Sequence, residues 1–133
     1  EAIKNRDFKI FLQPKISKTE PCQAEVLIRW LHPEKGMIYP NQFIPMFEQN
    51  GKIVELDLYV FEETCRLLSR WIKTGQAVTE VSVNISRFTL QKLGKAAREQ
   101  YKEMKEKYEI PDGLIEIEIT ETTLLSGNQI SYI

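Results

Sequence analysis

Two charged side chains, four residues apart on one predicted strand, are the first groups in this sequence that could do chemistry. The segment 24–30 alternates branched or aromatic residues with polar ones, which is typical of a β-strand. Because successive side chains point to opposite faces of a strand, Glu25, Leu27 and Arg29 share one face. Neither charge can be buried without a partner. The pattern predicts either a solvated edge strand with a weak Glu25–Arg29 ion pair or a strand that contributes polar groups to a site.

The same pattern recurs in further predicted strands, each with one apolar face and one face that carries carboxylate, amide or amine groups. The side chains on those second faces are Phe11, Gln13 and Lys15, then Ser82 and Asn84, and finally Glu116, Glu118 and Thr120. Long helical segments separate the later strands, and this alternation is typical of a parallel α/β sheet or barrel. Helices cover one face of such a sheet. The polar faces must then converge on an enclosed site or remain solvated.

The boundaries of these elements follow from periodicity and from turn residues. We expect strands over 8–16, 22–31, 80–86 and 114–120, and helices over 41–51, 54–72 and 93–109, with another helix starting at 122–126. Asn41 is the expected cap of the first helix, and Gly75 follows the second. Leu56, Val60, Leu67 and Trp71 give the second helix an apolar stripe, which Phe61, Leu68 and Ile72 widen. The connection over 17–21 is short and polar, so the first two strands are predicted to form an antiparallel hairpin.

Short motifs follow one another in a defined order along the chain. They are Leu12-Gln13-Pro14, Glu25-Val26-Leu27 with Arg29-Trp30, Phe43-Ile44-Pro45, Val83-Asn84-Ile85-Ser86 and Glu118-Ile119-Thr120-Glu121. With these motifs the chain resembles the N-terminal half of an EAL domain, the bacterial phosphodiesterase domain that hydrolyses cyclic di-GMP. The resemblance extends from about Phe8 to about Leu125. Val26 replaces the alanine of the family signature, but its side chain belongs to the apolar face, so Glu25 is unaffected.

The resemblance implies a particular fold and domain organisation. We expect an α/β fold, a partial (half) TIM-type barrel with its first strand antiparallel to the others and its helices on the outer face. A closed barrel needs about 250 residues, and this chain has 133. The family's second-half motifs (Asp-Asp-Phe-Gly, a lysine, a further glutamate and a glutamine) do not occur in it. The expected division is 1–7 as the end of a preceding linker helix and 8–133 as the N-terminal half of a truncated EAL domain.

Phosphodiester hydrolysis needs a water nucleophile and neutralisation of phosphoryl charge, and two divalent cations supply both. Glu25, Asn84 and Glu118 offer oxygen ligands on three adjacent predicted strands, and the resemblance implies the same assignment. It implies Mg²⁺ or Mn²⁺ in a two-metal site whose second ion relies mainly on aspartates outside this chain, so the fragment is expected to be inactive alone. Glu121 resembles the glutamate that anchors the loop over the metals. Its alternative role is an acid favoured by a helix N-terminus.

Three further residues are candidates for substrate binding. The planar guanidinium of Arg29 suits a substrate phosphate, although an ion pair with Glu25 or Glu118 is the alternative reading. Gln13 could orient substrate or a metal-bound water. The resemblance suggests that Leu27 packs beneath a guanine base. His32, next to a proline in a loop, is predicted to be a surface residue.

Composition excludes several classes of protein. The net charge of −1 leaves no basic excess to follow a nucleic-acid polymer. The sequence contains no apolar stretch as long as a membrane span, and its single histidine makes a zinc site improbable. Cys22 and Cys65 lack paired spacing and fit reduced thiols of an intracellular protein. The cysteines therefore favour a cytoplasmic location. The resemblance implies a longer parent chain that carries GGDEF or sensor domains and is compatible with membrane tethering.

Three functions are compatible with the sequence. The first is a cyclic di-GMP phosphodiesterase, which the intact Glu25, Arg29, Asn84, Glu118 and Glu121 favour. The second is a degenerate EAL domain that binds cyclic di-GMP without hydrolysis, and the third is a protein-interaction module. A partial barrel leaves an open sheet edge and an apolar surface. The isolated chain is therefore expected to form a homodimer around the edge at 114–120.

Overall fold

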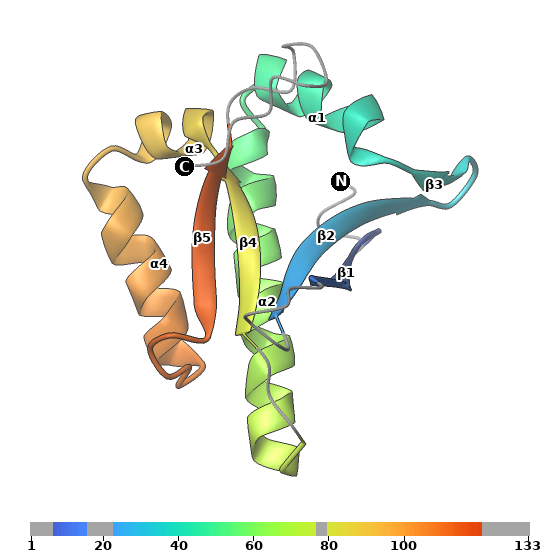
Figure 1. Ribbon diagram of the computed structural model, residues 1–133. Helices are drawn as coiled ribbons and strands as arrows, with labels where there is room; N and C mark the ends of the chain where they lie inside the picture. The colour runs from blue at the N-terminus through green and yellow to red at the C-terminus, as the bar shows by residue number, and fades with distance from the viewer. Residues whose placement is uncertain (1–6, 16–22, 77–79, 121–133) are drawn as a thin grey trace.

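The computed structural model describes residues 7–15, 23–76 and 80–120. The strands are β1 (Phe8–Lys15), β2 (Gln23–His32), β3 (Gly36–Ile38), β4 (Glu80–Ser86) and β5 (Ile115–Thr120). The helices are α1 (Pro40–Gln49), α2 (Ile53–Thr74), α3 (Arg87–Leu93) and α4 (Ala96–Lys107). Their arrangement is shown in Figure 1.

The strands form one mixed sheet in the order β1-β2-β4-β5, with β3 paired to β2. β1 is antiparallel to β2, whereas β4 is parallel to both β2 and β5. The predicted antiparallel first strand and α/β class are therefore confirmed. β2 and β4 pair only from Gln23–Glu80 to Glu25–Ser82. Past that point β2 bends away from β4 (Figure 1), which opens the sheet beside Glu25.

Helix α2 covers one face of the sheet, as Figure 1 shows where it runs behind β4. The buried apolar residues of these two elements are Ile53, Leu56, Val60, Phe61, Cys65 and Leu68 on α2 with Val81, Val83 and Ile85 on β4. The prediction that helices lie on the outer face is confirmed. Ile72 does not widen the apolar stripe as predicted. It is 40% exposed, because the last turns of α2 extend beyond the end of β4 (Figure 1).

Aromatic rings fix α1 against the β1–β2 hairpin. The Phe8 ring stacks on Trp30 with centroids 5.3 Å apart and meets Phe43 edge-on at 5.4 Å. Phe47 joins the cluster at 5.7 Å from Phe8. Such pairs contribute about 0.5–1.5 kcal/mol each beyond the burial of their area. The cluster therefore holds the first turns of α1 close to the strand that carries Glu25.

The predicted helix over 93–109 corresponds to α4, which is shorter at both ends, and a separate helix, α3, precedes it. Gly94, at φ 58°, ends α3, and a positive φ is one that glycine adopts without steric cost. α3 was not predicted, although Ser86 supplies its cap: the Ser86 hydroxyl accepts a hydrogen bond from the Phe88 N–H at 3.1 Å.

Other boundaries differ by smaller amounts. α1 begins at Pro40 with Tyr39 as its cap residue, so the prediction that Asn41 caps it is wrong. Proline suits the first helical position because its missing N–H is not needed there. β3 is too short for its alternation to be recognised. Cys22, Glu121 and the helix expected at 122–126 lie outside the described residues, as does most of the expected linker helix.

Candidate metal and substrate site

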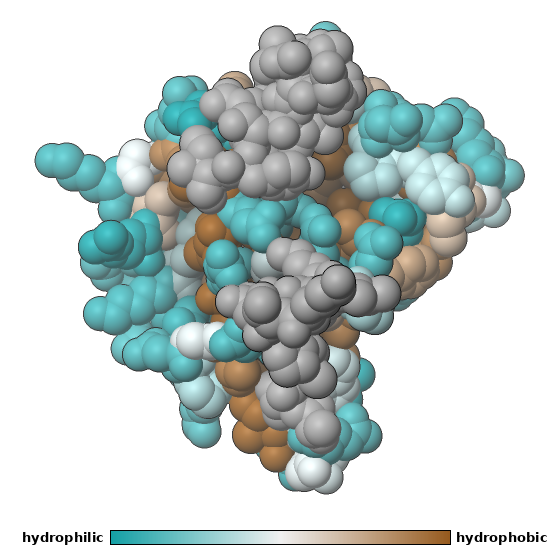
Figure 2. Space-filling view, in the orientation of Figure 1, coloured by the Kyte–Doolittle hydropathy of each residue, from teal (hydrophilic) through white to brown (hydrophobic). Residues whose placement is uncertain are grey.

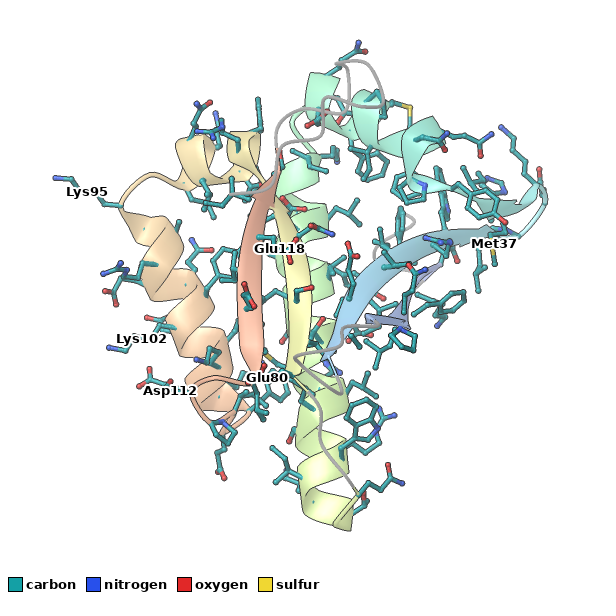
Figure 3. All side chains as sticks on the ribbon, in the orientation of Figure 1. Met37, Glu80, Lys95, Lys102, Asp112 and Glu118 are labelled. Atoms are coloured by element: carbon teal, nitrogen blue, oxygen red, sulfur yellow. The ribbon has the colours of Figure 1, made fainter. Side chains whose placement is uncertain are left out.

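Glu25 and Asn84 meet on the face of the sheet that α2 does not cover. The Asn84 Nδ2 donates a hydrogen bond to the Glu25 Oε2 at 3.0 Å. Asn84 is also the register partner of Glu118 across the parallel β4–β5 pair, so the two residues lie beside each other on neighbouring strands. Figure 3 labels Glu118 on β5. The fold thus brings the three predicted metal ligands together from β2, β4 and β5. Figure 2 shows hydrophilic side chains in the middle of this face, with hydrophobic ones beside them.

The other polar atom of the Asn84 amide is left unpaired. Asn84 Oδ1 is buried and has no hydrogen-bond partner among the described residues. A buried polar atom without a partner costs about 1–3 kcal/mol. Because Nδ2 already donates its hydrogen bond to Glu25, Oδ1 is the Asn84 atom that can coordinate a cation.

This donor set fits a hard divalent metal ion. Magnesium and manganese prefer carboxylate, carbonyl and water oxygens, and Glu25, Asn84 and Glu118 provide two carboxylates and one amide oxygen. Within the described ranges no group of three or more His, Cys, Asp or Glu side chains is placed to hold a metal. Three oxygen donors are fewer than the octahedral set that Mg²⁺ takes, so a cation at this place would need further ligands.

Arg29 follows Glu25 on the same face of β2 but does not form the ion pair that was the alternative reading. In the part of the chain that the structure describes, its NH1 donates to the Ile28 carbonyl oxygen at 2.9 Å. Its Cζ lies 5.2 Å from the centroid of the Tyr39 ring. Among the residues that the structure describes, these contacts hold the guanidinium without a carboxylate and leave most of its donors available for an anion.

The remaining predicted substrate residues lie on the same face of the sheet as Glu25 and Arg29. In the β1–β2 pairing, Gln13 is opposite Glu25 and Phe11 is opposite Leu27, so all four share one face. Gln13 is exposed and Leu27 half-buried. His32 is the half-buried last residue of β2 and does not lie in a loop as predicted. Its Nδ1 accepts the backbone N–H groups of Glu34 and Lys35, in the turn that follows, at 3.1 and 3.2 Å.

A cavity of about 220 Å³ adjoins the Glu25–Asn84 pair where β2 and β4 separate. Leu27 lines it from β2, and α1 and α2 close its other side. The polar groups that line it include Glu25, Asn84, Ser86, Glu48 and Asp57. The site is therefore continuous with a partly open cavity that is lined by two acidic side chains not predicted to be functional.

Asp57, on α2, binds the junction that follows Asn84. Its Oδ2 accepts the Ser86 N–H at 2.9 Å and the Thr89 hydroxyl at 2.5 Å. The Ser86 hydroxyl lies 3.4 Å from the Glu48 Oε2. Burial raises the pKa of Asp57 to about 7, which the nearby Glu48 favours and the two hydrogen bonds oppose. The carboxyl group thus ties α2 to the end of the strand that positions Asn84.

Sequence reasoning missed Asp57, although a signal was present. Asp57 interrupts the apolar side of α2 between Leu56 and Val60, where a solvated acid is not expected. An acidic residue inside an otherwise apolar stripe indicates a buried partner. Glu48 gave no comparable signal, because it lies near the end of a short helix.

We expect Asp57→Asn to change how stability depends on pH. The folded-state pKa is about 7 against 3.8 for the ordinary value, so the native protein keeps a proton that the unfolded chain loses between these pH values. The free energy of unfolding that Asp57 contributes is therefore fully present below about pH 4 and is lost as pH rises towards 7. Asparagine does not titrate. The stability of Asp57→Asn relative to wild type should increase by up to about 1.4 kcal/mol per pH unit across this window.

The measurement is chemical denaturation of both proteins from pH 4.5 to 7.5. Asp112→Asn, at an exposed position, controls for the same chemical change. A stability difference between wild type and Asp57→Asn that does not vary with pH would contradict the expectation.

The family model of the EAL domain matches residues 1–131, and the chain belongs to this family. One relative is the bifunctional diguanylate cyclase/cyclic di-GMP phosphodiesterase MucR of Pseudomonas aeruginosa, 30% identical over 135 residues, which cover 100% of this chain and 19% of the relative. Another is the cyclic di-GMP phosphodiesterase PdeR of Escherichia coli, 33% identical over 134 residues, with 98% and 20% covered. The chain spans about a fifth of the length of these relatives.

Solved structures agree with this membership. The PaMucR phosphodiesterase in complex with c-di-GMP matches with a TM-score of 0.78 at 29% identity, covering 96% of this chain and 51% of that one. The FimX EAL domain of Xanthomonas citri in complex with c-diGMP matches at 0.76 with 18% identity, covering 89% and 45%. The sheet and its helices are therefore part of the EAL barrel fold, and the expected partial barrel is confirmed. In the described residues no helix has the length and apolar composition to cross a bilayer.

Proposed function

We propose that the domain containing this chain is a metal-dependent phosphodiesterase that hydrolyses cyclic di-GMP to the linear dinucleotide. The observation that carries this proposal is the Asn84 amide, which binds Glu25 through Nδ2 and leaves a buried Oδ1 unpaired. That arrangement suits a cation on the face of the sheet that α2 does not cover. The names of MucR and PdeR, and the c-di-GMP in the MucR structure, favour this substrate.

Glu25, Asn84 and Glu118 would hold Mg²⁺ or Mn²⁺, which when bound lowers the pKa of water and stabilises charge on phosphoryl oxygens. The hydrogen bond from Asn84 fixes the orientation of the Glu25 carboxylate. We assign the remaining ligands of a two-metal site to residues outside this chain. The chain alone then provides an incomplete site.

The substrate-binding roles are proposed on the same face of the sheet. Arg29 would bind a phosphate through the donors that Ile28 leaves free, and Leu27 would pack against a guanine at the mouth of the cavity. Gln13, opposite Glu25, would orient substrate or a metal-bound water. Glu121 would anchor the loop over the metals.

The test is turnover of cyclic di-GMP by the domain that contains this chain, first with excess Mg²⁺ and then with Mn²⁺. Product formation that stops on addition of EDTA would support the proposal. Tight binding of cyclic di-GMP without hydrolysis under both metals would replace it with a receptor function. The 133-residue chain assayed alone is the control for the incomplete site.

We propose that the chain acts in the cytoplasm alongside other signalling domains. The MucR relative is bifunctional by name, and a LapD structure with a GGDEF and an EAL domain has the same fold at 20% identity. A GGDEF or sensor domain in the same chain would place the phosphodiesterase under the control of an input signal.

We also propose that the isolated chain forms a homodimer through β5. In the described part of the sheet β5 pairs only with β4, so its other edge offers backbone hydrogen-bonding groups. Ile117 is 39% exposed on this strand, and the groove between β5 and α4 measures about 860 Å³. Pairing of two copies would cover both features.

We expect light scattering of the purified 133-residue chain to give twice the monomer mass. Ile117→Lys should shift this mass towards the monomer, because a charge on the pairing strand disfavours edge-to-edge association. Ile72→Lys, also at an exposed isoleucine but on α2, is the matched control. A monomer with cooperative unfolding would contradict the proposal.

A further inference from the structure

Lys9 and Arg29 lie directly opposite each other on the β1–β2 hairpin. They are register partners in the antiparallel pairing, and opposite residues of such a pair project from the same face. Arg29 shares that face with Glu25 and Leu27. Because β1 runs antiparallel, its second residue lies next to the carboxyl-terminal part of β2. Lys9 is therefore on the site face, at the same end of the sheet as Arg29.

Neither of these two cations has an acidic partner in the part of the chain that the structure describes. Arg66, Lys105 and Lys107 are among the other bases that form ion pairs there. Like charges directly opposite each other on neighbouring strands are unfavourable. An anion that binds between the two charges reduces the repulsion between them.

The Arg29 side chain is held in one orientation. Its NH1 donates to the Ile28 carbonyl oxygen at 2.9 Å, and its guanidinium lies against the Tyr39 ring at 5.2 Å. A cation over an aromatic ring is stabilised and restrained in position. Within the described residues, these contacts leave the other guanidinium donors and the Lys9 ammonium group available for a ligand.

We propose that Lys9 is a further substrate-binding residue, which together with Arg29 binds the phosphate of the cyclic dinucleotide that is not held at Glu25 and Asn84. This inference rests on the proposed function. A cyclic dinucleotide carries two phosphodiesters, and only one can occupy the oxygen-rich site at a time. The second negative charge then needs cations at a distance from the carboxylates, and Lys9 with Arg29 is such a pair on the same face.

The experiment compares Lys9→Gln and Lys9→Arg with wild type in the full-length protein. Lys102→Gln is the matched control, because Lys102 is an exposed lysine on α4 that points away from the sheet (Figure 3). The measurements are KM and kcat for cyclic di-GMP, the same constants for bis(p-nitrophenyl) phosphate, and equilibrium binding of cyclic di-GMP without divalent cations. The second substrate has one phosphodiester, so it would not reach the Lys9–Arg29 pair while reacting at the metal site.

Lys9→Gln should raise KM and Kd for cyclic di-GMP about fivefold, the upper range for a solvent-accessible ion pair. It should leave kcat and both constants for bis(p-nitrophenyl) phosphate within twofold of wild type. Lys9→Arg should restore wild-type values. A Lys9→Gln protein that matches Lys102→Gln, or that loses activity on both substrates equally, would overturn the assignment.

These outcomes separate this inference from the proposed function. A wild-type protein that binds cyclic di-GMP without hydrolysing it would refute the phosphodiesterase, while the Kd of Lys9→Gln still decides the role of Lys9. A wild-type protein that neither binds nor hydrolyses the dinucleotide would overturn both.

Discussion

Replacing Glu25 with alanine is expected to reduce hydrolysis of cyclic di-GMP by at least about 100-fold in the domain that contains this chain. Removal of residues that merely support a metal ligand costs 10–100-fold, and a direct ligand should cost no less. Glu25 is half-buried on the open face of the sheet, so the change removes little packing. It also leaves the Asn84 Nδ2 without its acceptor. The measurement is turnover at saturating Mg²⁺.

Glu103→Ala is the matched control, because Glu103 is an exposed acid on α4. Both variants should unfold at similar temperatures. If Glu25→Ala folds and retains wild-type turnover, Glu25 is not a metal ligand and the carboxylate has only a hydrogen-bonding role.

Replacing Asn84 should separate metal binding from catalysis. Asn84→Ala removes both the buried Oδ1 and the hydrogen bond to Glu25. We expect turnover at limiting Mg²⁺ to fall about 10–100-fold and to recover in part when the metal concentration is raised. The measurement is the dependence of rate on Mg²⁺ concentration, from which the half-saturating concentration is obtained.

Asn84→Asp is the variant to compare with Asn84→Ala, because it keeps an oxygen ligand at this position. Its carboxylate would lie near that of Glu25, so the protein should need a cation more strongly and lose stability when the cation is removed. We expect Asn84→Asp to retain more activity than Asn84→Ala at high Mg²⁺. Equal loss in both variants, with an unchanged Mg²⁺ dependence, would mean that Asn84 acts through packing.

The Asp57 network gives these predictions a structural basis. Asp57 binds Ser86 and Thr89 immediately after Asn84, so the end of β4 is attached to α2 by a buried carboxyl group. Groups that support a metal ligand in this way restrict where its oxygen can lie. The pH dependence expected for Asp57→Asn therefore tests the same part of the molecule by a measurement that needs no substrate.

The sequence alone determined which residues share a strand face and which motifs occur in order. Alternation placed Glu25 with Arg29 and gave β4 as 80–86, which are the bounds that the structure has. Gly75 ends α2 as predicted, in a left-handed conformation at φ 75°. These features depend on neighbouring residues along the chain, so local patterns are enough to reveal them.

Only the tertiary structure decided which of these faces meet and in what register. The Glu25–Asn84 hydrogen bond joins residues 59 apart in sequence, and the opposition of Lys9 and Arg29 depends on the exact pairing of β1 with β2. A shift of one residue in that pairing would turn one side chain to the opposite face. The burial of Asp57 likewise depends on α1, β4 and α3 closing around it. Side-chain periodicity fixes a direction for each residue, but its partners are set by the packing of segments that are distant in the chain.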